Sequence, residues 1–173
     1  MQNYAFYKRT RKGKVVRLVH QKYLRLDVGY GYIGANSIPE SKLREIVASA
    51  PHKQLLVIDT NVALHQIDVL EYKCPATSLV VVLQTVLQEL RHLNLATYRR
   101  LNALLKDENR FYIFFPNELA AETSILRKQK EIVNDFNDRA IRKAVEHFNL
   151  ALNGVGKAIM ISNDRDNQVF VVM

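Results

Sequence analysis

The stretch Leu55-Leu56-Val57-Ile58-Asp59-Thr60-Asn61 decides the fold, because a buried strand ends there in a carboxylate. Four consecutive apolar residues are typical of a short strand that is covered on both faces. An acid at the end of such a strand needs a partner, and this edge of an open α/β sheet is where ligands bind. We therefore expect Asp59 to hold a ligand, and specifically a divalent metal.

The rest of the main domain alternates between strands and helices. The pattern predicts strands at 55–58, 79–83, 111–115 and 157–162, and helices at 61–70, 85–105 with a break near Asn94, 118–127 and 138–152. This order predicts an α/β fold with a Rossmann-like parallel sheet flanked by helices. The final apolar run, 169–173, fits either another strand or a chain cut short. A doubly wound domain ordinarily adds one more helix and strand, so we expect the closing helix and strand to be missing.

Residues 1–52 are expected to form a small N-terminal extension and residues 53–173 the main domain. Within the extension, strands at 15–19 and 23–28 are expected to form a hairpin-like unit, and a helix should run from about Ser37 to Ala50. Residues 29–34 match the pattern GxGxxG. No helix opens directly after this match, which argues against a dinucleotide site. A loop of glycine and tyrosine that packs or stacks on a partner fits better.

The net charge of +8 is concentrated at the N-terminus. The first 25 residues contain eight lysines and arginines and no acid, so the rest of the chain has 17 basic and 17 acidic residues. Such asymmetry favours a polyanion partner, RNA or DNA. A solvated arm and an acidic protein partner are the alternatives. The expected basic arm consists of Lys8, Arg9, Arg11, Lys12, Lys14 and Arg17.

Several classes of protein are disfavoured by what the sequence lacks. Cys74 is the only cysteine, so an intrachain disulfide and a cysteine-based zinc site are excluded, which fits a reducing compartment. The five histidines are scattered, and no phosphate-binding GxxxxGK[ST] motif occurs. No apolar run approaches the length of a membrane span, and we expect no membrane partner.

Four acids occupy comparable places in this pattern. Asp59 and Asp164 end strands, Glu89 lies about one turn into a helix that follows a strand, and Asp138 is expected to open the long helix. In a parallel sheet these positions meet at one edge, and Asp166 is close enough to join them. Simpler interpretations exist: Asp138 as a helix cap, Glu89 as a solvated residue and Asp164 as part of a turn.

Clustered carboxylates cannot all remain charged without a cation between them. Their hard oxygen ligands suit Mg²⁺ or Mn²⁺. A metal held in this way can activate water for attack on a phosphodiester. Together with the basic arm, the acids therefore indicate a nuclease.

The order of these motifs resembles the PIN nuclease family. The resemblance is closest to the N-terminal PIN domain of the catalytic, ribonuclease-II-like subunit of the eukaryotic RNA exosome, and it runs from about residue 6 to residue 167. It is carried by DTNV at 59–62, LHQIDVLE at 64–71, LQTVLQE at 83–89, NDRAIR at 137–142 and NDR at 163–165, and before the domain by YKRTRKG at 7–13 and YLR at 23–25.

The resemblance implies endonucleolytic cleavage of single-stranded RNA with one or two Mn²⁺ or Mg²⁺ ions. It places Asp59, Glu89, Asp138 and Asp164 at the metal, with Asp166 as a further candidate. Thr60 and Asn61 are expected to orient Asp59 or to contact phosphate, and Arg139 and Arg165 to steady the RNA backbone.

The resemblance also implies partners and a location. We expect docking to the exosome core subunits, a role in RNA processing including ribosomal RNA, and a ribonuclease-II-like exonuclease domain in the same or a separate chain. A nuclear and nucleolar location follows, with the cytoplasm as an additional site. The alternatives are a non-catalytic module that tethers the subunit to the exosome core or RNA, and a PIN nuclease that acts on another RNA such as a ribosomal precursor.

Two departures from the family stand out. The related extension usually carries a small cysteine cluster after its Tyr-Leu-Arg motif, whereas this chain has Gly29-Tyr30-Gly31-Tyr32 there. The family protein continues into RNA-binding barrels and an exonuclease domain that this sequence does not contain. The chain is therefore expected to be either a fragment or a separately encoded endonuclease.

Overall fold

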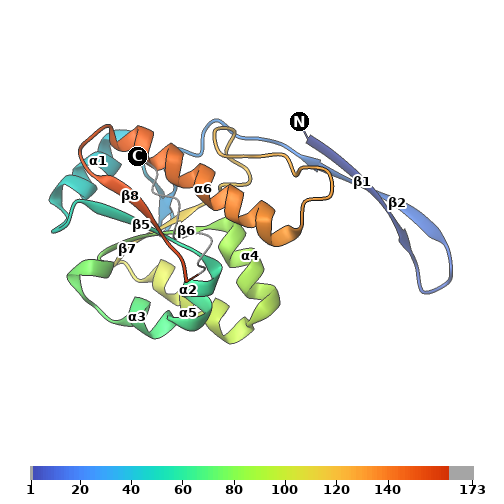
Figure 1. The fold of residues 1–173 in the computed structure, drawn as a ribbon, viewed down its shortest axis with the longest axis horizontal. Coiled ribbons are helices and arrows are strands. Elements are labelled where there is room, and N and C mark those ends of the chain that lie inside the picture. Colours follow the sequence, from blue (N-terminus) through green and yellow to red (C-terminus); the bar gives the residue numbers. More distant parts are fainter. Residues whose placement is uncertain (1, 164–173) are drawn as a thin grey trace.

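A computed structural model describes residues 2–163, apart from the side chains of residues 2–6, 20–22 and 76. Its centre is a six-stranded sheet with the order β4-β3-β7-β6-β5-β8 (Figure 1). The parallel strands are β5 (Gln54–Ile58), β6 (Leu79–Leu83), β7 (Phe111–Phe115) and β8 (Lys157–Ile161). The short strands β3 (Tyr32–Ile33) and β4 (Asn36–Ser37) add an antiparallel edge. The predicted α/β class is confirmed.

The helices form a layer on each side of this sheet (Figure 1). On one side lie α1 (Glu40–Ser49) and α6 (Val133–Leu152); on the other lie α2 (Thr60–His65), α3 (Ile67–Glu71) and α5 (Leu95–Lys106). Helix α4 (Gln84–Leu93) leaves the carboxyl end of β6, and a 3₁₀ turn, Pro75–Thr77, precedes that strand. Within the described part of the chain, no helix is both long and apolar enough to cross a membrane.

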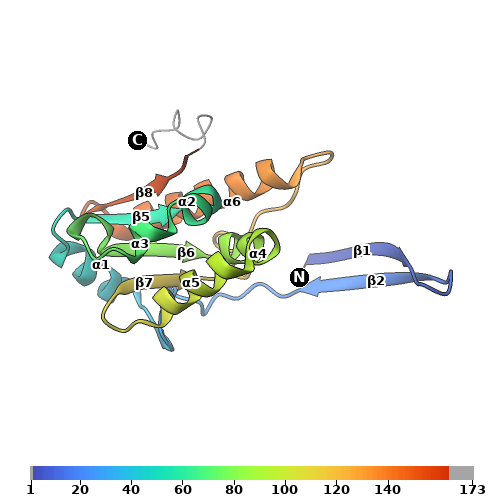
Figure 2. The ribbon, with the colours of Figure 1, turned by 90° about the horizontal axis from the view of Figure 1, so that it is seen from below.

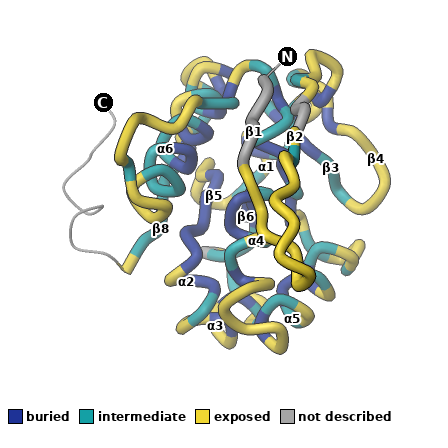
Figure 3. The backbone as a smooth tube through the Cα atoms, turned by 90° about the vertical axis from the view of Figure 1, so that its right-hand side faces the viewer, coloured by how far each residue is buried: buried dark blue, intermediate teal, exposed yellow. Residues whose placement is uncertain are grey.

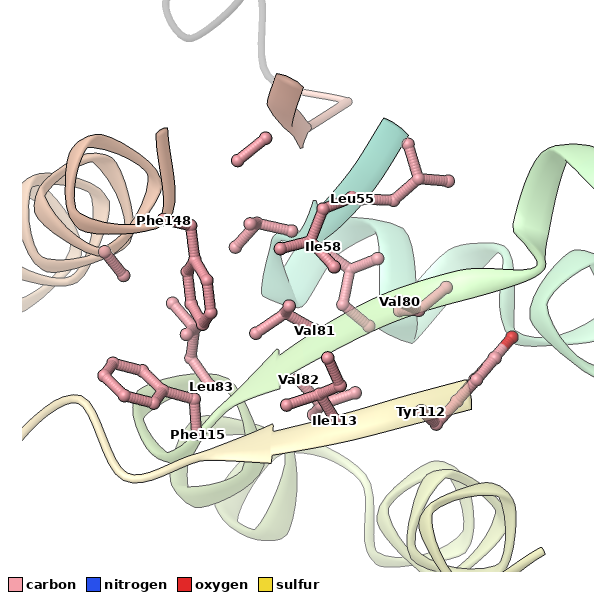
Figure 4. Packing of buried hydrophobic residues seen from close by; sticks show 14 of the residues in the cluster. Leu55, Ile58, Val80, Val81, Val82, Leu83, Tyr112, Ile113, Phe115 and Phe148 are labelled. Carbon is pink, nitrogen blue, oxygen red and sulfur yellow. The ribbon is translucent and has the colours of Figure 1, made fainter. Parts of the chain in front are cut away.

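The core lies between the sheet and the two helical layers. All five residues of β6 are buried, as expected for a central strand that is covered on both faces (Figures 3 and 4). On the α6 side, the rings of Phe115 and Phe148 meet edge to face with their centroids 5.1 Å apart. This packing fixes α6 against the end of β7.

The N-terminal hairpin differs from the prediction. It pairs β1 (Gln2–Arg9) with β2 (Val15–Lys22) and projects away from the domain (Figure 2). The expected pairing of 15–19 with 23–28 is wrong because a tight turn, in which Gly13 has φ +78°, joins β1 to β2. The backbone of Arg25 instead bonds to Leu119 and Ala121.

Residues 28–50 belong to the packed domain, because Val28, Ile38, Leu43 and Val47 are buried in its core. Side chains on both sides of residue 52 share one core, so the division into an extension and a main domain is not a division in packing. It stays a prediction about function. Gly31 is needed where β3 approaches β7: it has φ +103°, and a Cβ there would lie 2.5 Å from the carbonyl oxygen of Phe114. No helix opens directly after the GxGxxG match, because β4 comes next and α1 begins only at Glu40.

The helix predictions were right in part. The break near Asn94 is confirmed, because its Oδ1 accepts hydrogen bonds from the N–H groups of Ala96 and Thr97 and caps α5. The helix expected at 61–70 is split at Gln66, whose φ of −127° is not helical. The helix expected at 118–127 is wrong: turns occupy that segment, and the run expected at 169–173 lies outside the described residues.

Candidate metal centre

Asp59 directly follows β5 and is the N-cap of α2. Its backbone N–H donates to the carbonyl of Ile161 in β8, at 3.0 Å, and Asp59 as a whole is only 3% exposed. The carboxylate Oδ1 accepts a hydrogen bond from the N–H of Thr60 at 2.5 Å. Asp59 is therefore held at the carboxyl edge of the sheet, between β5 and β8, as the sequence predicts.

A hydrogen-bonded network extends from Asp59 to two helices. Ser162 Oγ donates to Asp59 Oδ2 at 2.8 Å, and Thr60 Oγ1 donates to Glu89 Oε2 at 2.7 Å. Asn137 Nδ2 in α6 donates to the same Glu89 oxygen at 3.1 Å. Thr60 thus connects Asp59 with Glu89 and brings together groups from the ends of β5 and β8 and from α4 and α6.

The electrostatics of this network leave room for a cation. All donors to Asp59 and Glu89 in it are neutral amides or hydroxyls. Among the described residues, neither acid forms an ion pair with a lysine, arginine or histidine. Each carboxylate oxygen can accept a further bond, and hard oxygen donors suit Mg²⁺ or Mn²⁺. The residues present therefore fit a divalent metal.

The other predicted ligands are placed less directly. Asp138 does not open the long helix, because α6 begins five residues earlier at Val133; it is half-buried in the second turn and follows Asn137. Asp164, Arg165 and Asp166 lie outside the described residues. Within the described range, no three acids, histidines or cysteines gather into a metal-binding group.

Thr60 and Asn61 differ in their surroundings. Thr60 is 4% exposed and bonds to both acids, whereas Asn61 is exposed in the first turn of α2. The contact of Thr60 with Asp59 is the one that the sequence led us to expect. For Asn61, a contact with phosphate stays a prediction.

Arg139 makes its contacts within the chain. Its guanidinium forms two hydrogen bonds of 2.9 Å with the carboxylate of Glu131 and one of 2.8 Å with the carbonyl of Leu126. This pairing lowers the pKa of Glu131 to about 2 and raises the pKa of Arg139. A direct contact of Arg139 with RNA stays a prediction.

Sequence reasoning missed three polar residues at this edge. Ser162 ends the predicted strand 157–162, and Asn137 directly precedes the predicted ligand Asp138. These positions were the only signal in the sequence that the two residues belong to the site. Asn117, 1% exposed, lies two residues beyond β7; its Oδ1 accepts from the N–H of Thr85 at 3.2 Å and its Nδ2 donates to Thr85 Oγ1 at 2.8 Å. This pair ties the segment after β7 to the first turn of α4.

The residues of the basic arm lie on the hairpin. Lys8, Arg9, Arg11, Lys12, Lys14 and Arg17 are all exposed, on both strands and in the turn between them. The hairpin extends beyond the end of the sheet to which the parallel strands point (Figures 2 and 3).

A mostly parallel sheet with helices on both faces, and with the buried Asp59 and the half-buried Glu89 at its carboxyl edge, defines an α/β domain whose ligand site lies at that edge. The family model of the PIN domain matches residues 56–170, and the chain belongs to this family. The resemblance inferred from the motifs is thereby confirmed.

The relatives are more specific. The chain is 40% identical to mouse exosome complex exonuclease RRP44 and 36% identical to exosome complex exonuclease RRP44 homolog A of Arabidopsis thaliana, over 95% and 97% of its length. It spans only 18% and 17% of those two proteins. Among solved structures it is similar to the T. brucei RRP44 PIN domain, with a TM-score of 0.67, 26% identity and coverage of 84% of this chain and 83% of that one.

Proposed function

We propose that this chain is a metal-dependent endoribonuclease domain that cleaves single-stranded RNA. The observation that carries the proposal is the contact of Thr60 with both Asp59 and Glu89 at the carboxyl edge of the sheet. Two acids linked in this way, with only neutral donors, form a site of the kind that a cation completes.

Asp59, Glu89, Asp138 and Asp164 would hold one or two Mn²⁺ or Mg²⁺ ions, with Asp166 as a further ligand. When bound, such an ion lowers the pKa of a water ligand and offsets the charge that develops on the phosphate. The part played by the chain's own hydrogen bonds is orientation. Ser162 and Thr60 fix Asp59, and Thr60 and Asn137 fix Glu89, so that the ligand oxygens are arranged before any ion arrives.

Binding of the RNA would rest on other groups. Asn61, exposed beside Asp59, can donate to a phosphate oxygen, and Arg165 is proposed to steady the RNA backbone. The exposed basic arm of the hairpin would follow the phosphates of a single strand, which can bend into a shallow site more readily than a duplex can.

The relatives support a place for this domain in the RNA exosome. Proteins named exosome complex exonuclease align with nearly the whole chain, including the hairpin and the segment before the sheet. We propose that it serves RNA processing and decay, including that of ribosomal RNA, in the nucleus and nucleolus and also in the cytoplasm. The hairpin and domain would dock on the core subunits, and an exonuclease domain would act in the same or a separate chain.

The test is cleavage of a circular single-stranded RNA, which has no ends for an exonuclease. With Mn²⁺, the chain should linearise the circle, whereas the Asp59→Asn variant should not. Asp68→Asn, which makes the same change at an exposed acid paired with Arg100, should remain active. Absence of Mn²⁺-dependent cutting by the folded chain, or full activity of Asp59→Asn, would reject the proposal.

The second candidate is a non-catalytic PIN module that tethers a subunit to the exosome core or RNA. One observation favours it: the exposed basic hairpin projects away from the domain, where it can contact a partner without any metal. Such a module would bind its partner equally well with and without Asp59, and it would leave the circular RNA intact.

A further inference from the structure

The loop before α6 is basic at its tip and is held by its own contacts. Residues 126–131 read Leu-Arg-Lys-Gln-Lys-Glu, and we refer to them as the clamped loop. Arg127, Lys128 and Lys130 are exposed, and Lys130 has φ +64°, a turn conformation unusual for a side chain of its kind. A loop of this composition would ordinarily be loose, so its contacts decide what it can do.

Glu131 is the centre of those contacts. Its carboxylate, 8% exposed, accepts two hydrogen bonds from Arg139, and its Oε2 also accepts from the N–H of Lys128 at 2.8 Å. Its backbone carbonyl accepts from Nε of Arg127 at 2.9 Å, and Arg139 also binds the carbonyl of Leu126. Arg139 of α6 thus binds both ends of the loop. We call the contacts that Arg139 makes with Glu131 and Leu126 the clamp.

The clamp leaves the ammonium groups of the two tip lysines exposed to solvent. Glu131, the acid inside the loop, is committed to Arg139 in a bidentate pair. Among the described residues, neither Lys128 nor Lys130 forms an ion pair through its ammonium group. Two ammonium groups are therefore presented from a fixed turn.

The clamp and the candidate metal centre are both in contact with helix α6. Asn137, which binds Glu89, and Arg139, which holds the loop, are two residues apart in α6. At about 100° per residue their side chains leave the helix on nearly opposite sides, so α6 lies between the clamp and Glu89. Figure 2 shows the loop extending beyond the carboxyl edge of the sheet, on the same side as the hairpin.

We infer that the clamped loop is an RNA-binding element, in which Lys128 and Lys130 contact phosphates of a single strand that leads into the metal centre. Arg139 and Glu131 are positioning residues that act through the loop. This inference rests on the proposed function for the identity of its ligand, and it assigns the RNA contact to the lysines that Arg139 holds in place.

The experiment measures RNA binding without cleavage. The Asp59→Asn chain is titrated into a short fluorescent oligouridylate at several NaCl concentrations, with and without Lys128→Gln and Lys130→Gln. Loss of two phosphate contacts should reduce the slope of log K against log salt by about 1.4, since each contact to a single strand contributes about 0.7. The matched control is Lys73→Gln with Lys157→Gln, which also removes two positive charges. These exposed lysines lie before β6 and at the start of β8, at the amino edge of the sheet, away from the candidate metal centre.

The clamp itself is tested by the sign of one effect. Glu131→Ala removes a negative charge next to the basic tip, so electrostatic attraction alone predicts tighter RNA binding. If the clamp positions the lysines, affinity falls instead, and the salt slope moves toward that of the lysine double variant. Circular dichroism and thermal melting confirm that each variant is folded.

The outcomes separate the two proposals. A salt slope that falls for the loop pair and not for the control pair supports the inference, whether or not the wild-type chain cuts RNA. An unchanged slope, an equal fall in both pairs, or no RNA binding overturns it even if Mn²⁺-dependent cleavage is observed. Unchanged or tighter binding by Glu131→Ala overturns the role of the clamp.

Discussion

Replacing Thr60 by valine tests whether the hydroxyl of this residue organises the two acids. Valine keeps the shape of the 4%-exposed threonine but removes the hydrogen bond of 2.7 Å to Glu89. A hydrogen bond to a charged acceptor contributes about 1.5–3 kcal/mol. Glu89 is half-buried and keeps its bond from Asn137, so the loss in unfolding free energy should be about 1–2 kcal/mol.

Thr60→Val should weaken metal binding more than it destabilises the fold. Loss of a group that orients a metal ligand typically costs about 10–100-fold in metal affinity. Thr60→Val should therefore weaken Mn²⁺ binding by that factor, as measured by isothermal titration, with urea unfolding in parallel. The control is Thr123→Val: this threonine is 1% exposed and donates a bond of 2.8 Å to the carbonyl of Asn117. Equal Mn²⁺ affinities for the two variants would refute the reasoning.

Two further predictions concern the fold around the site. Gly31→Ala should lower the unfolding free energy by about 3 kcal/mol, because its Cβ would meet the carbonyl of Phe114; Gly154→Ala, also at positive φ but with open space around it, should cost only about 1–2 kcal/mol by the same denaturation assay. His147, stacked between Tyr30 and Phe115 with its Nε2 buried and unbonded among the described groups, has its pKa lowered by burial, with Glu122 and Glu40 opposing and Lys143 reinforcing this shift. The unfolded chain then binds the proton first, so stability should decrease as pH falls below about 6.5, and a His147→Phe variant whose melting temperature keeps the same pH dependence would contradict this.

The central strands could be predicted because such short, continuous apolar runs are typical of strands that are buried on both faces. A run such as 79–83 is buried along its whole length, and 55–58 ends in an acid whose position marks the carboxyl edge. The break at Asn94 was equally accessible, since an asparagine that caps a helix acts on its own neighbours. These features depend on local chemistry or on simple burial.

The features that sequence reasoning missed depend on distant partners. The segment after β7 has a helical composition, but the side chains of Asn117 and Thr123 bond to backbone groups and stabilise turns instead. Helix α6 begins at Val133 because the preceding turn is closed by Arg139 and Glu131, a contact between residues eight positions apart. The same contact shows that Arg139, which we expected at the RNA backbone, also holds a loop.

The edge position of two of the predicted acids could be read from the sequence, whereas their hydrogen bonds could not. Asp59 and Glu89 were expected at one edge, and the structure joins them through Thr60. Ser162 and Asn137 could not be assigned, because serine and asparagine occur at strand ends and in helices for many reasons. Their value appears only when the fold brings β8 and α6 to the same carboxylates.

The most direct test of the account is the binding of Mn²⁺ itself. Electron paramagnetic resonance follows free Mn²⁺ as the folded chain is added, and the signal should decrease as ions are taken up. Asp59→Asn and Glu89→Gln should each abolish this uptake, while Asp68→Asn at the exposed pair with Arg100 should retain it. Equal uptake by all four proteins would contradict a metal centre at Asp59 and Glu89.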